Sequence, residues 1–156
     1  MRVEEIMHRP VVACSPGDHL GVAARLMWEK DCGALPVVDG DGRVIAMITD
    51  RDICMAALTQ GLCLEDIPVQ TAMSRQIHAC RPEDQMTDVH SLMGDKQIRR
   101  VPVVDGDHHL VGILSINDMT RNVARPTNTG NPTAKAAVIR TLAEVGAPHH
   151  GPTHEI

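Results

Sequence analysis

Hydrophobic and polar positions follow two different periods in the first part of the chain. One stretch has apolar residues at the i, i+3, i+4 and i+7 spacing that is typical of a helix with one buried face: Leu20, Ala23, Ala24 and Met27. Two short apolar runs, 35–38 and 44–48, flank the polar turn 39–42, a pattern that predicts a β-hairpin. An earlier apolar run at 11–14 is followed by Ser-Pro-Gly and predicts a short first strand.

Residues with capping preferences mark the ends of the predicted helices. Asp18 is a good N-cap for the first helix, and Gly33 is expected to end it. A second helix is predicted from about residue 50 to residue 58, with Gly61 beyond its end. The whole unit therefore reads strand, helix, strand, strand, helix, or βαββα.

An internal repeat is the most informative pattern in the sequence. The segment 36–41, Pro-Val-Val-Asp-Gly-Asp, recurs at 102–107, and the step from position 36 to position 102 defines the repeat offset. The same offset relates outlying residues without a gap, for example Met7 to Met73. One copy alone cannot bury the face of its sheet. The sequence therefore predicts an α/β (α+β) fold of two βαββα repeats, packed sheet to sheet around one shared core with pseudo-two-fold symmetry.

The repeat divides the chain into three parts: repeat 1 over residues 1–62, repeat 2 over residues 63–125, and a tail over residues 126–156. The tail starts as a linker rich in Pro, Thr, Asn and Gly and then predicts a short helix over 133–145. Val138, Leu142 and Val145 lie on one side of this helix. The last ten residues are expected to be disordered. The sequence leaves open whether the helix docks on the repeats or on a second subunit.

Composition and charge restrict the function further. A net charge of -5 and a pI near 5.9 argue against nucleic acid as the main partner. No apolar run reaches the roughly 20 residues of a membrane span, and the charged N-terminus has no signal-peptide core. The 5 cysteines, an odd number, indicate free thiols and a cytoplasmic protein. There is no Phe or Tyr and a single Trp, so aliphatic side chains must build the core.

In both copies, three short segments resemble the CBS domain: 6–7 with 72–73, 35–39 with 101–105, and 47–52 with 113–118. Their order, spacing and duplication resemble a tandem CBS pair, or Bateman module, and they cover about residues 1–123. The resemblance implies a stand-alone regulatory protein that binds an adenosine-containing ligand (AMP, ADP, ATP or S-adenosylmethionine) in clefts between the two repeats. It also implies signalling to a partner protein or within a homodimer, because CBS pairs dimerise through their helices into a flat disc.

The resemblance also assigns binding residues. The resemblance implies that the ribose and phosphate are bound by the Thr/Ser-x-x-Asp motif at the start of the second helix in each copy: Thr49, Asp52, Ser115 and Asp118. It implies that the adenine pocket is lined by residues at the end of the first strand and just before the hairpin: Cys14, Cys32, Gly33, Ala34, Cys80, Ile98, Arg99 and Arg100. Inside the motif, Arg51 is replaced by Asn117 in the second copy. Arg51, Arg99 and Arg100 suit a phosphate group, since guanidinium pairs well with it. Because the copies differ, the two clefts should differ.

Other interpretations stay open. The Thr/Ser-x-x-Asp motifs also match a capping box, so a ligand-free structural or dimerisation module is one alternative. Cys14 and Cys80 match across the repeat and allow a thiol-based redox or metal sensor, although core packing is favoured for both. Trp28 is assigned to packing or to a dimer contact. No nucleophile–base pair, metal-ligand spacing or Gly-rich phosphate loop is present, so we expect no enzyme, no catalytic residue, no metal ligand and no obligatory cofactor.

Overall fold

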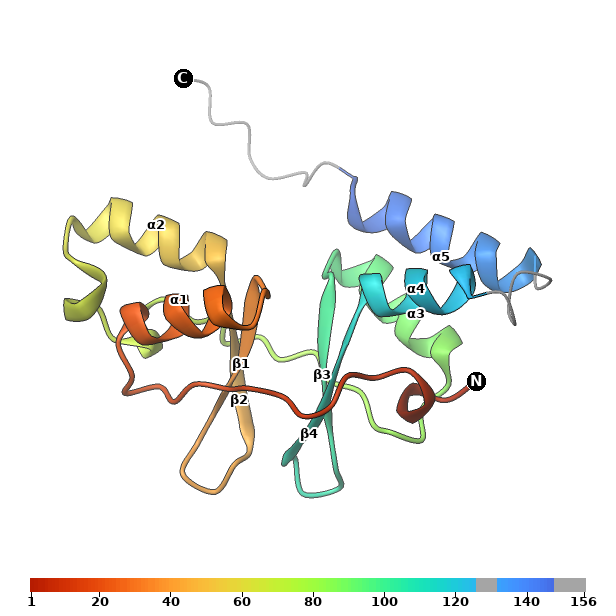
Figure 1. Ribbon diagram of the computed structural model, residues 1–156, viewed down its shortest axis with the longest axis horizontal. Helices are drawn as coiled ribbons and strands as arrows, with labels where there is room; N and C mark the ends of the chain where they lie inside the picture. Colours follow the sequence, from red (N-terminus) through yellow and green to blue (C-terminus); the bar gives the residue numbers. More distant parts are fainter. Residues whose placement is uncertain (126–131, 148–156) are drawn as a thin grey trace.

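The computed structural model describes residues 1–125 and 132–147. The elements run in chain order as η1 Val3–Glu5, α1 Leu20–Glu29, β1 Ala34–Val38, β2 Val44–Thr49, α2 Asp50–Gln60, η2 Leu64–Asp66, η3 Val69–Thr71, α3 Met86–Lys96, β3 Arg100–Val104, β4 Leu110–Ser115, α4 Ile116–Ala124 and α5 Pro132–Val145. Figure 1 shows the two hairpins side by side, with helices of both repeats lying on the same side of them. The predicted mixed α/β architecture of two similar repeats is therefore confirmed. The expected disorder of the last ten residues, except Ala147, and most of the expected linker lie outside the described residues.

Both predicted hairpins form, and their registers are equivalent. Leu35 pairs with Ile48 in one hairpin and Val101 pairs with Leu114 in the other, and each ladder has one irregularity near its turn. In the first turn, Asp39 Oδ1 accepts hydrogen bonds from the backbone N–H groups of residue 41, at 3.0 Å, and of residue 43, at 2.9 Å. The second turn repeats this arrangement around Asp105. These aspartates stabilise turns, as their positions in the sequence indicate.

The predicted first strand at 11–14 is wrong in its extent. Only Cys14 pairs there, through a single parallel bridge to Val37 of β1, and Cys80 makes the equivalent bridge to Val103 of β3. A few residues earlier, His8 forms a bridge to Ile113 of β4. Figure 1 shows this N-terminal segment passing across both hairpins. Because it crosses from one hairpin to the other, it contacts each only briefly and cannot run alongside either as a strand.

Two of the predicted helix caps are also wrong. Helix α1 begins after His19, and Asp18 instead accepts a hydrogen bond from the Ser15 backbone N–H at 2.8 Å, closing the turn before the helix. The helix ends at its C-cap Lys30, and Gly33 lies in the loop that leads into β1. The prediction for α2 is confirmed, because Gly61 adopts the left-handed conformation (φ 63°) that ends this helix.

The buried residues form two clusters, one for each repeat, and not the single shared core that the sequence predicts. Each hairpin has helices of its own to cover its apolar face, so the two clusters remain distinct. The repeats nevertheless exchange their leading segments. Val3 belongs to the cluster of repeat 2, and its counterpart Val69 belongs to the cluster of repeat 1. Each buried cluster therefore contains the leading segment of the other repeat, and the two repeats depend on each other for their cores.

Helix α5 settles the question that the sequence leaves open, because it docks on α3 and α4 of repeat 2 (Figure 1). Its buried residues are Val138, Thr141 and Val145. Leu142, expected on the same side, is 44% exposed, since Thr141 occupies the buried position and forms a hydrogen bond with the His90 ring. Within the described residues, none of the helices has the length and apolar character needed to cross a bilayer.

Candidate functional site: two clefts between the repeats

Two clefts lie between the repeats. Cleft A has a volume of about 480 Å³ and is lined by residues that include Cys32, Ala34, Arg100, Ser115, Asn117 and Asp118. Cleft B has a volume of about 400 Å³ and is lined by residues that include Gly33, Thr49, Arg51, Asp52, Ile98 and Arg99. The repeat offset relates most of one lining to the other, for example Ser115 to Thr49 and Cys32 to Ile98. The clefts are therefore repeat-related sites of one kind.

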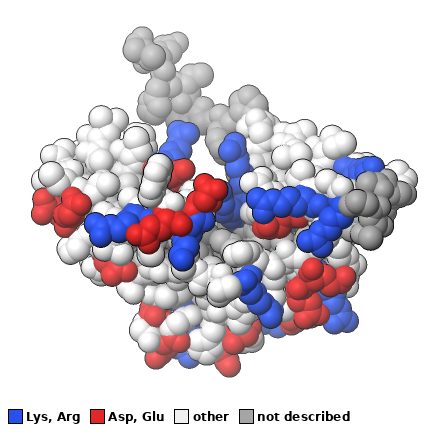
Figure 2. Space-filling model, viewed as in Figure 1, with Lys and Arg blue, Asp and Glu red and all other residues white. Residues whose placement is uncertain are grey.

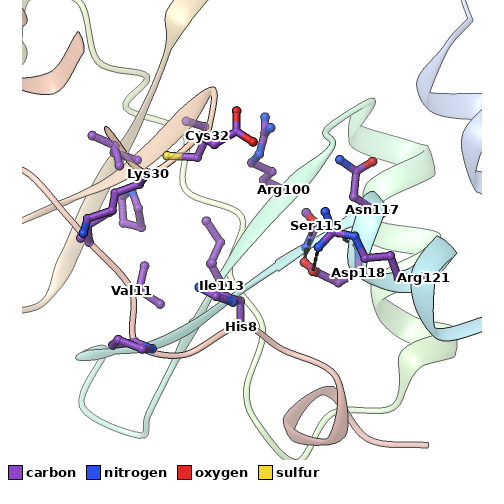
Figure 3. A pocket seen from close by; sticks show the side chains of 16 residues that line it. His8, Val11, Lys30, Cys32, Arg100, Ile113, Ser115, Asn117, Asp118 and Arg121 are labelled. Atoms are coloured by element: carbon purple, nitrogen blue, oxygen red, sulfur yellow. Dashed lines mark hydrogen bonds and ion pairs between the residues drawn. The ribbon is translucent and has the colours of Figure 1, made fainter. Parts of the chain in front are cut away.

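Each cleft takes its two halves from different repeats. Cleft A combines the entry to β1 with the N-terminus of α4, and Figure 3 shows Cys32 and Lys30 on one side with Ser115, Asn117 and Asp118 on the other. Cleft B combines the entry to β3 with the N-terminus of α2. The sequence places Arg51 and Arg99 in different copies, but the fold brings both of them to cleft B.

The helix start at each cleft is a complete capping box. Asp52 Oδ2 accepts hydrogen bonds from the Thr49 backbone N–H at 2.8 Å and from the Thr49 hydroxyl at 2.7 Å, and Thr49 Oγ1 accepts from the Asp52 N–H at 3.2 Å. Ser115 and Asp118 repeat the arrangement on α4. The capping role is therefore present in both copies. It occupies Oδ2 of each carboxylate and leaves Oδ1 of Asp52 without a hydrogen-bond partner among the described residues.

Both clefts carry charges of both signs. The charged side chains of cleft A come from Lys30, Asp31, Arg100, Asp118 and Arg121. Those of cleft B come from Asp50, Arg51, Asp52, Arg99 and Arg100. Figure 2 shows Lys and Arg side chains across the middle of this face, with Asp and Glu side chains among them. Cations outnumber carboxylates in each lining, which favours an anionic group on a ligand.

Arg100 lies where the two clefts meet and lines both of them. Its Nη2 atom is 3.7 Å from the point that a Cβ on Gly33 would occupy, so the side chain of repeat 2 reaches the loop of repeat 1 (Figure 3). The same Cβ would lie 2.8 Å from Asp50 Oδ2, and a side chain at position 33 is therefore excluded unless Asp50 moves. The guanidinium of Arg100 forms no ion pair with the described residues.

Sequence reasoning missed two cations of cleft A, Lys30 and Arg121. Arg121 Nη1 lies 3.9 Å from Asp118 Oδ1. Because these residues are three positions apart on α4, helical spacing alone would place them on the same side. Lys30 follows the end of α1, and nothing in its local sequence points to a cleft.

Two predicted site residues, Cys14 and Cys80, line neither cleft. Their side chains are 3% and 4% exposed, and their Sγ atoms point to the carbonyl oxygens of Pro36 and Pro102. Burial, with a smaller effect from Asp18, raises the pKa of Cys14 to about 11. Burial, with a smaller effect from a nearby aspartate, raises the pKa of Cys80 to about 12. Their place in the adenine pocket is corrected to core packing, because the bridges to β1 and β3 turn both thiols inward.

The described residues hold no cysteine pair and no metal cluster. All 5 cysteines are free, and Cys14 and Cys80 belong to different buried clusters. In the part of the chain that the structure describes, no group of three or more His, Cys, Asp or Glu side chains is placed to hold a metal ion. The remaining predicted residues, from Cys32 to Asp118, all line one or both clefts.

Comparison with known proteins identifies the class to which this architecture belongs. The CBS domain family matches residues 3–59 and again residues 64–125, so the chain belongs to this family as a tandem CBS pair. The CBS domain-containing protein YhcV of Bacillus subtilis is 35% identical over 129 residues, which cover 83% of this chain and 90% of that protein. Hypoxic response protein 1 of Mycobacterium tuberculosis is 33% identical over 119 residues, covering 76% of this chain and 82% of that protein.

Solved structures of CBS pairs have the same fold. The CBS domain pair of protein MJ0100, in complex with 5-methylthioadenosine and S-adenosylmethionine, superposes with a TM-score of 0.71 at 26% identity, covering 78% of this chain and 94% of that one. Hypoxic Response Protein I with two coordinated zinc ions superposes with a TM-score of 0.71 at 32% identity, covering 78% and 98%. The fold and the regulatory family are thereby established.

Proposed function

We propose that this protein is a regulatory, non-catalytic module that binds an adenosine-containing ligand in clefts A and B. The candidate ligands are AMP, ADP, ATP and S-adenosylmethionine, and the bound state is signalled to a partner protein or within a homodimer. The observation that carries this proposal is the pair of repeat-related clefts, each with a helix N-terminus, a motif aspartate and arginine side chains. The CBS pair that binds methylthioadenosine and S-adenosylmethionine supports it.

Each part of such a ligand has a chemical counterpart in the clefts. The N-terminus of α2 or α4 presents the partial positive charge of a helix to a phosphate or carboxylate. In α2 the backbone N–H groups of residues 50, 51 and 52 already donate to Gly33, Asp50 and Thr49, so the attraction comes from the helix dipole and the nearby arginines. Asp52 Oδ1 is available to accept hydrogen bonds from a ribose diol. Arg51 and Arg99 in cleft B can form charge-assisted hydrogen bonds with phosphate. The volumes of 480 and 400 Å³ lie within the usual range for small-molecule sites.

Neither cleft lining contains Phe, Tyr or Trp, so the apolar surface for an adenine ring is mainly aliphatic. Cleft A offers Val11, Val12 and Ile113, and cleft B offers Met47 and Ile98. A flat ring gains from burial between such side chains through the hydrophobic effect. Because Cys14 and Cys80 are turned into the cores, we propose that these aliphatic residues provide the packing surfaces.

Thermal unfolding with and without ligand tests this proposal. Wild type, Asp52→Asn and Asp118→Asn are compared in the presence of each of the four ligands. At 100 times its dissociation constant a ligand adds about 2.7 kcal/mol to the free energy of unfolding, a shift of several degrees. We expect this ligand-induced shift in wild type, and its reduction by the variant of the occupied cleft. A weaker helix cap lowers Tm equally in the presence and absence of ligand. The difference in Tm between the two conditions therefore reports ligand binding alone.

The same experiment separates the alternatives. No shift with any of the four ligands contradicts the adenosyl proposal and favours a structural module, in which the two capping boxes have no other role. A shift with zinc alone favours a metal sensor, an alternative that the zinc-bound Hypoxic Response Protein I keeps open. Equal shifts in wild type and both variants place the ligand outside clefts A and B.

A further inference from the structure

The end of helix α5 forms part of the wall of cleft B. Val145, the last residue of the helix, lines this cleft together with Gln97 and Ile98. Val145 is 6% exposed and belongs to the buried cluster of repeat 2, against which Ile98 also packs. Cleft B therefore has a third contributor, in addition to the entry to β3 and the N-terminus of α2.

Gln97 links the wall of cleft B to helix α5. It is the C-cap of α3, in the left-handed conformation (φ 52°), and its side chain faces α5. Gln97 Nε2 donates to the carbonyl oxygens of Glu144 and Ala147 at 3.3 and 3.1 Å. These carbonyl groups lie at the C-terminal end of α5, where a helix leaves acceptors without partners of its own. The orientation of the Gln97 side chain at the cleft therefore depends on the docked position of α5.

Cleft A has no equivalent of this wall. The repeat offset relates Gln97 to Asp31, which lines cleft A, and Gly94 to Trp28. Gly94 packs directly against Glu144 of α5, whereas Trp28 is 87% exposed beside an open groove between α1 and α2. Core packing, one of the two roles that the sequence assigns to Trp28, is therefore wrong. No described residue of α5 lines cleft A, so the two clefts differ in their relation to this helix.

Helix α5 is held in place by a narrow buried strip. Of its 14 residues, Val138, Thr141 and Val145 are buried, while Ile139 and Leu142 stay exposed. An isolated helix of about this length is marginal in water, so docking on α3 and α4 is what keeps α5 helical. The segment therefore has two discrete states, a docked helix and an undocked chain. Only the docked state places Val145 at cleft B.

We propose that ligand binding in cleft B and the docking of α5 stabilise each other, and that cleft A binds its ligand independently of α5. A ligand in cleft B meets the apolar surface of Val145 and an ordered Gln97 side chain only when α5 is docked, so its affinity is higher for the docked state. A ligand shifts an equilibrium through such a difference in affinity. By linkage, docking raises the affinity of cleft B by the same factor by which the ligand favours docking. The inference rests on the proposed function and specifies how the occupancy of one cleft reaches an element outside the repeats.

Two adjacent residues of α5 supply a matched pair of variants. Val138 is 4% exposed and Ile139 is 67% exposed, and neither lines cleft B. Val138→Asp places a carboxylate in the buried strip and should undock α5, whereas Ile139→Asp introduces the same residue at the solvent-exposed surface of the helix.

A third variant undocks α5 from the side of α3. A Cβ at position 94 would lie 3.0 Å from the carboxyl carbon of Glu144, so the longer side chain of Gly94→Leu displaces α5. Because Leu favours a helix more than Gly does, this change does not weaken α3 itself.

Calorimetry of the full chain measures the affinities for AMP, ADP, ATP and S-adenosylmethionine. Asp52→Asn and Asp118→Asn assign each binding event to a cleft. We expect Val138→Asp and Gly94→Leu to weaken binding in cleft B about 5-fold or more and to leave cleft A unchanged. Ile139→Asp should leave both clefts unchanged. Unchanged binding in cleft A also shows that the variants are folded.

Hydrogen exchange of the α5 backbone amides measures the reciprocal effect. In wild type, the ligand of cleft B should slow this exchange, and Asp52→Asn should reduce the effect. Without ligand, exchange should be fast in Val138→Asp and Gly94→Leu and slow in Ile139→Asp. If α5 stays protected in both undocking variants, it is not a separable element and the proposal is overturned.

The outcomes distinguish this inference from the proposed function. Equal affinity of cleft B in all three variants, or binding confined to cleft A, overturns the coupling and leaves an adenosyl-binding module in place. Equal weakening of both clefts, or tighter binding in cleft B after undocking, also contradicts the coupling. If none of the four ligands binds to wild type, the proposed function fails and the coupling fails with it.

Discussion

Asp52 and Asp118 show how one residue can serve folding and a candidate site together. Each uses one carboxylate oxygen to cap its helix and stands at the mouth of a cleft. The cap holds the carboxylate in one orientation before any ligand arrives, which lowers the entropy cost of binding. Cys14 and Cys80 pack in the two cores, and burial raises the pKa of both thiols, which disfavours the thiolate.

Thiol accessibility gives a prediction at this scale. With a disulfide reagent at pH 8, we expect fast reaction at the exposed Cys54 and Cys63, and very slow reaction at Cys14 and Cys80 until the protein unfolds. The thiolate is the reactive form, and a pKa of about 11 or 12 leaves almost none of it at pH 8. The double variant Cys54→Ser with Cys63→Ser should lose the fast phase. Rapid modification of Cys80 in that variant would contradict the buried position.

Helix α5 distinguishes the two repeats at the scale of elements. Its partners in repeat 2 are polar as well as apolar, with His90 and Gln97 both contributing hydrogen bonds. Burial, and to a smaller extent the nearby positive charge of Arg140, lowers the pKa of His90 from its usual 6.5. The neutral imidazole is therefore the form that the docked helix favours.

The free energy of unfolding should depend on pH through His90. Above pH 6.5 the imidazole is neutral in the folded and unfolded states, and the docked helix retains its full stability. Below pH 6.5 the unfolded chain takes up a proton more readily, so stability is lost as the pH falls toward the lowered folded pKa. We expect Tm to fall more steeply between pH 7 and pH 5 in wild type than in His90→Gln, measured by circular dichroism. If Tm falls equally with pH in wild type and in His90→Gln, protonation of His90 does not affect the docking of α5.

At the scale of the whole molecule, Arg100 connects the two clefts. It belongs to β3 of repeat 2, reaches the loop of repeat 1, and lines both sites. Arg99, its neighbour in sequence, lines cleft B and not cleft A. Arg99 lies in the bend before β3 and Arg100 is the first residue of the strand, so the two neighbours share cleft B while only Arg100 also reaches cleft A.

This difference supplies a matched pair of variants. For a phosphate-bearing ligand measured by calorimetry, Arg100→Gln should weaken binding in both clefts by about 10-fold or more, as expected for losing a charge-assisted hydrogen bond. Arg99→Gln should weaken binding in cleft B only. Asp118→Asn and Asp52→Asn identify which binding event belongs to which cleft. If Arg100→Gln weakens binding in one cleft only, the Arg100 guanidinium does not contact ligand in both clefts, and the prediction is wrong.

The sequence by itself determined both hairpins, the helices that flank them and the duplication of the unit, but not the first strand. Hydrophobic periodicity fixed both hairpins, and the constant offset between copies of one motif fixed the repeated fold. These features depend on local periodicity and identity, which a chain displays directly. The predictions for Asp18 and Gly33 failed because the preference of a residue type for a cap position is a weak tendency. The turn before α1 and the loop after it decide where the helix begins and ends.

Only the tertiary structure decided which residues meet. Arg51 and Arg99 share a cleft although they belong to different copies, and Val3 and Val69 complete each other's repeats. The structure also showed that α5 fills the groove beside Gly94 and leaves the groove of Trp28 open. These outcomes depend on how two similar surfaces pack against each other. That packing is set by shape and burial across the whole chain, which no local pattern records.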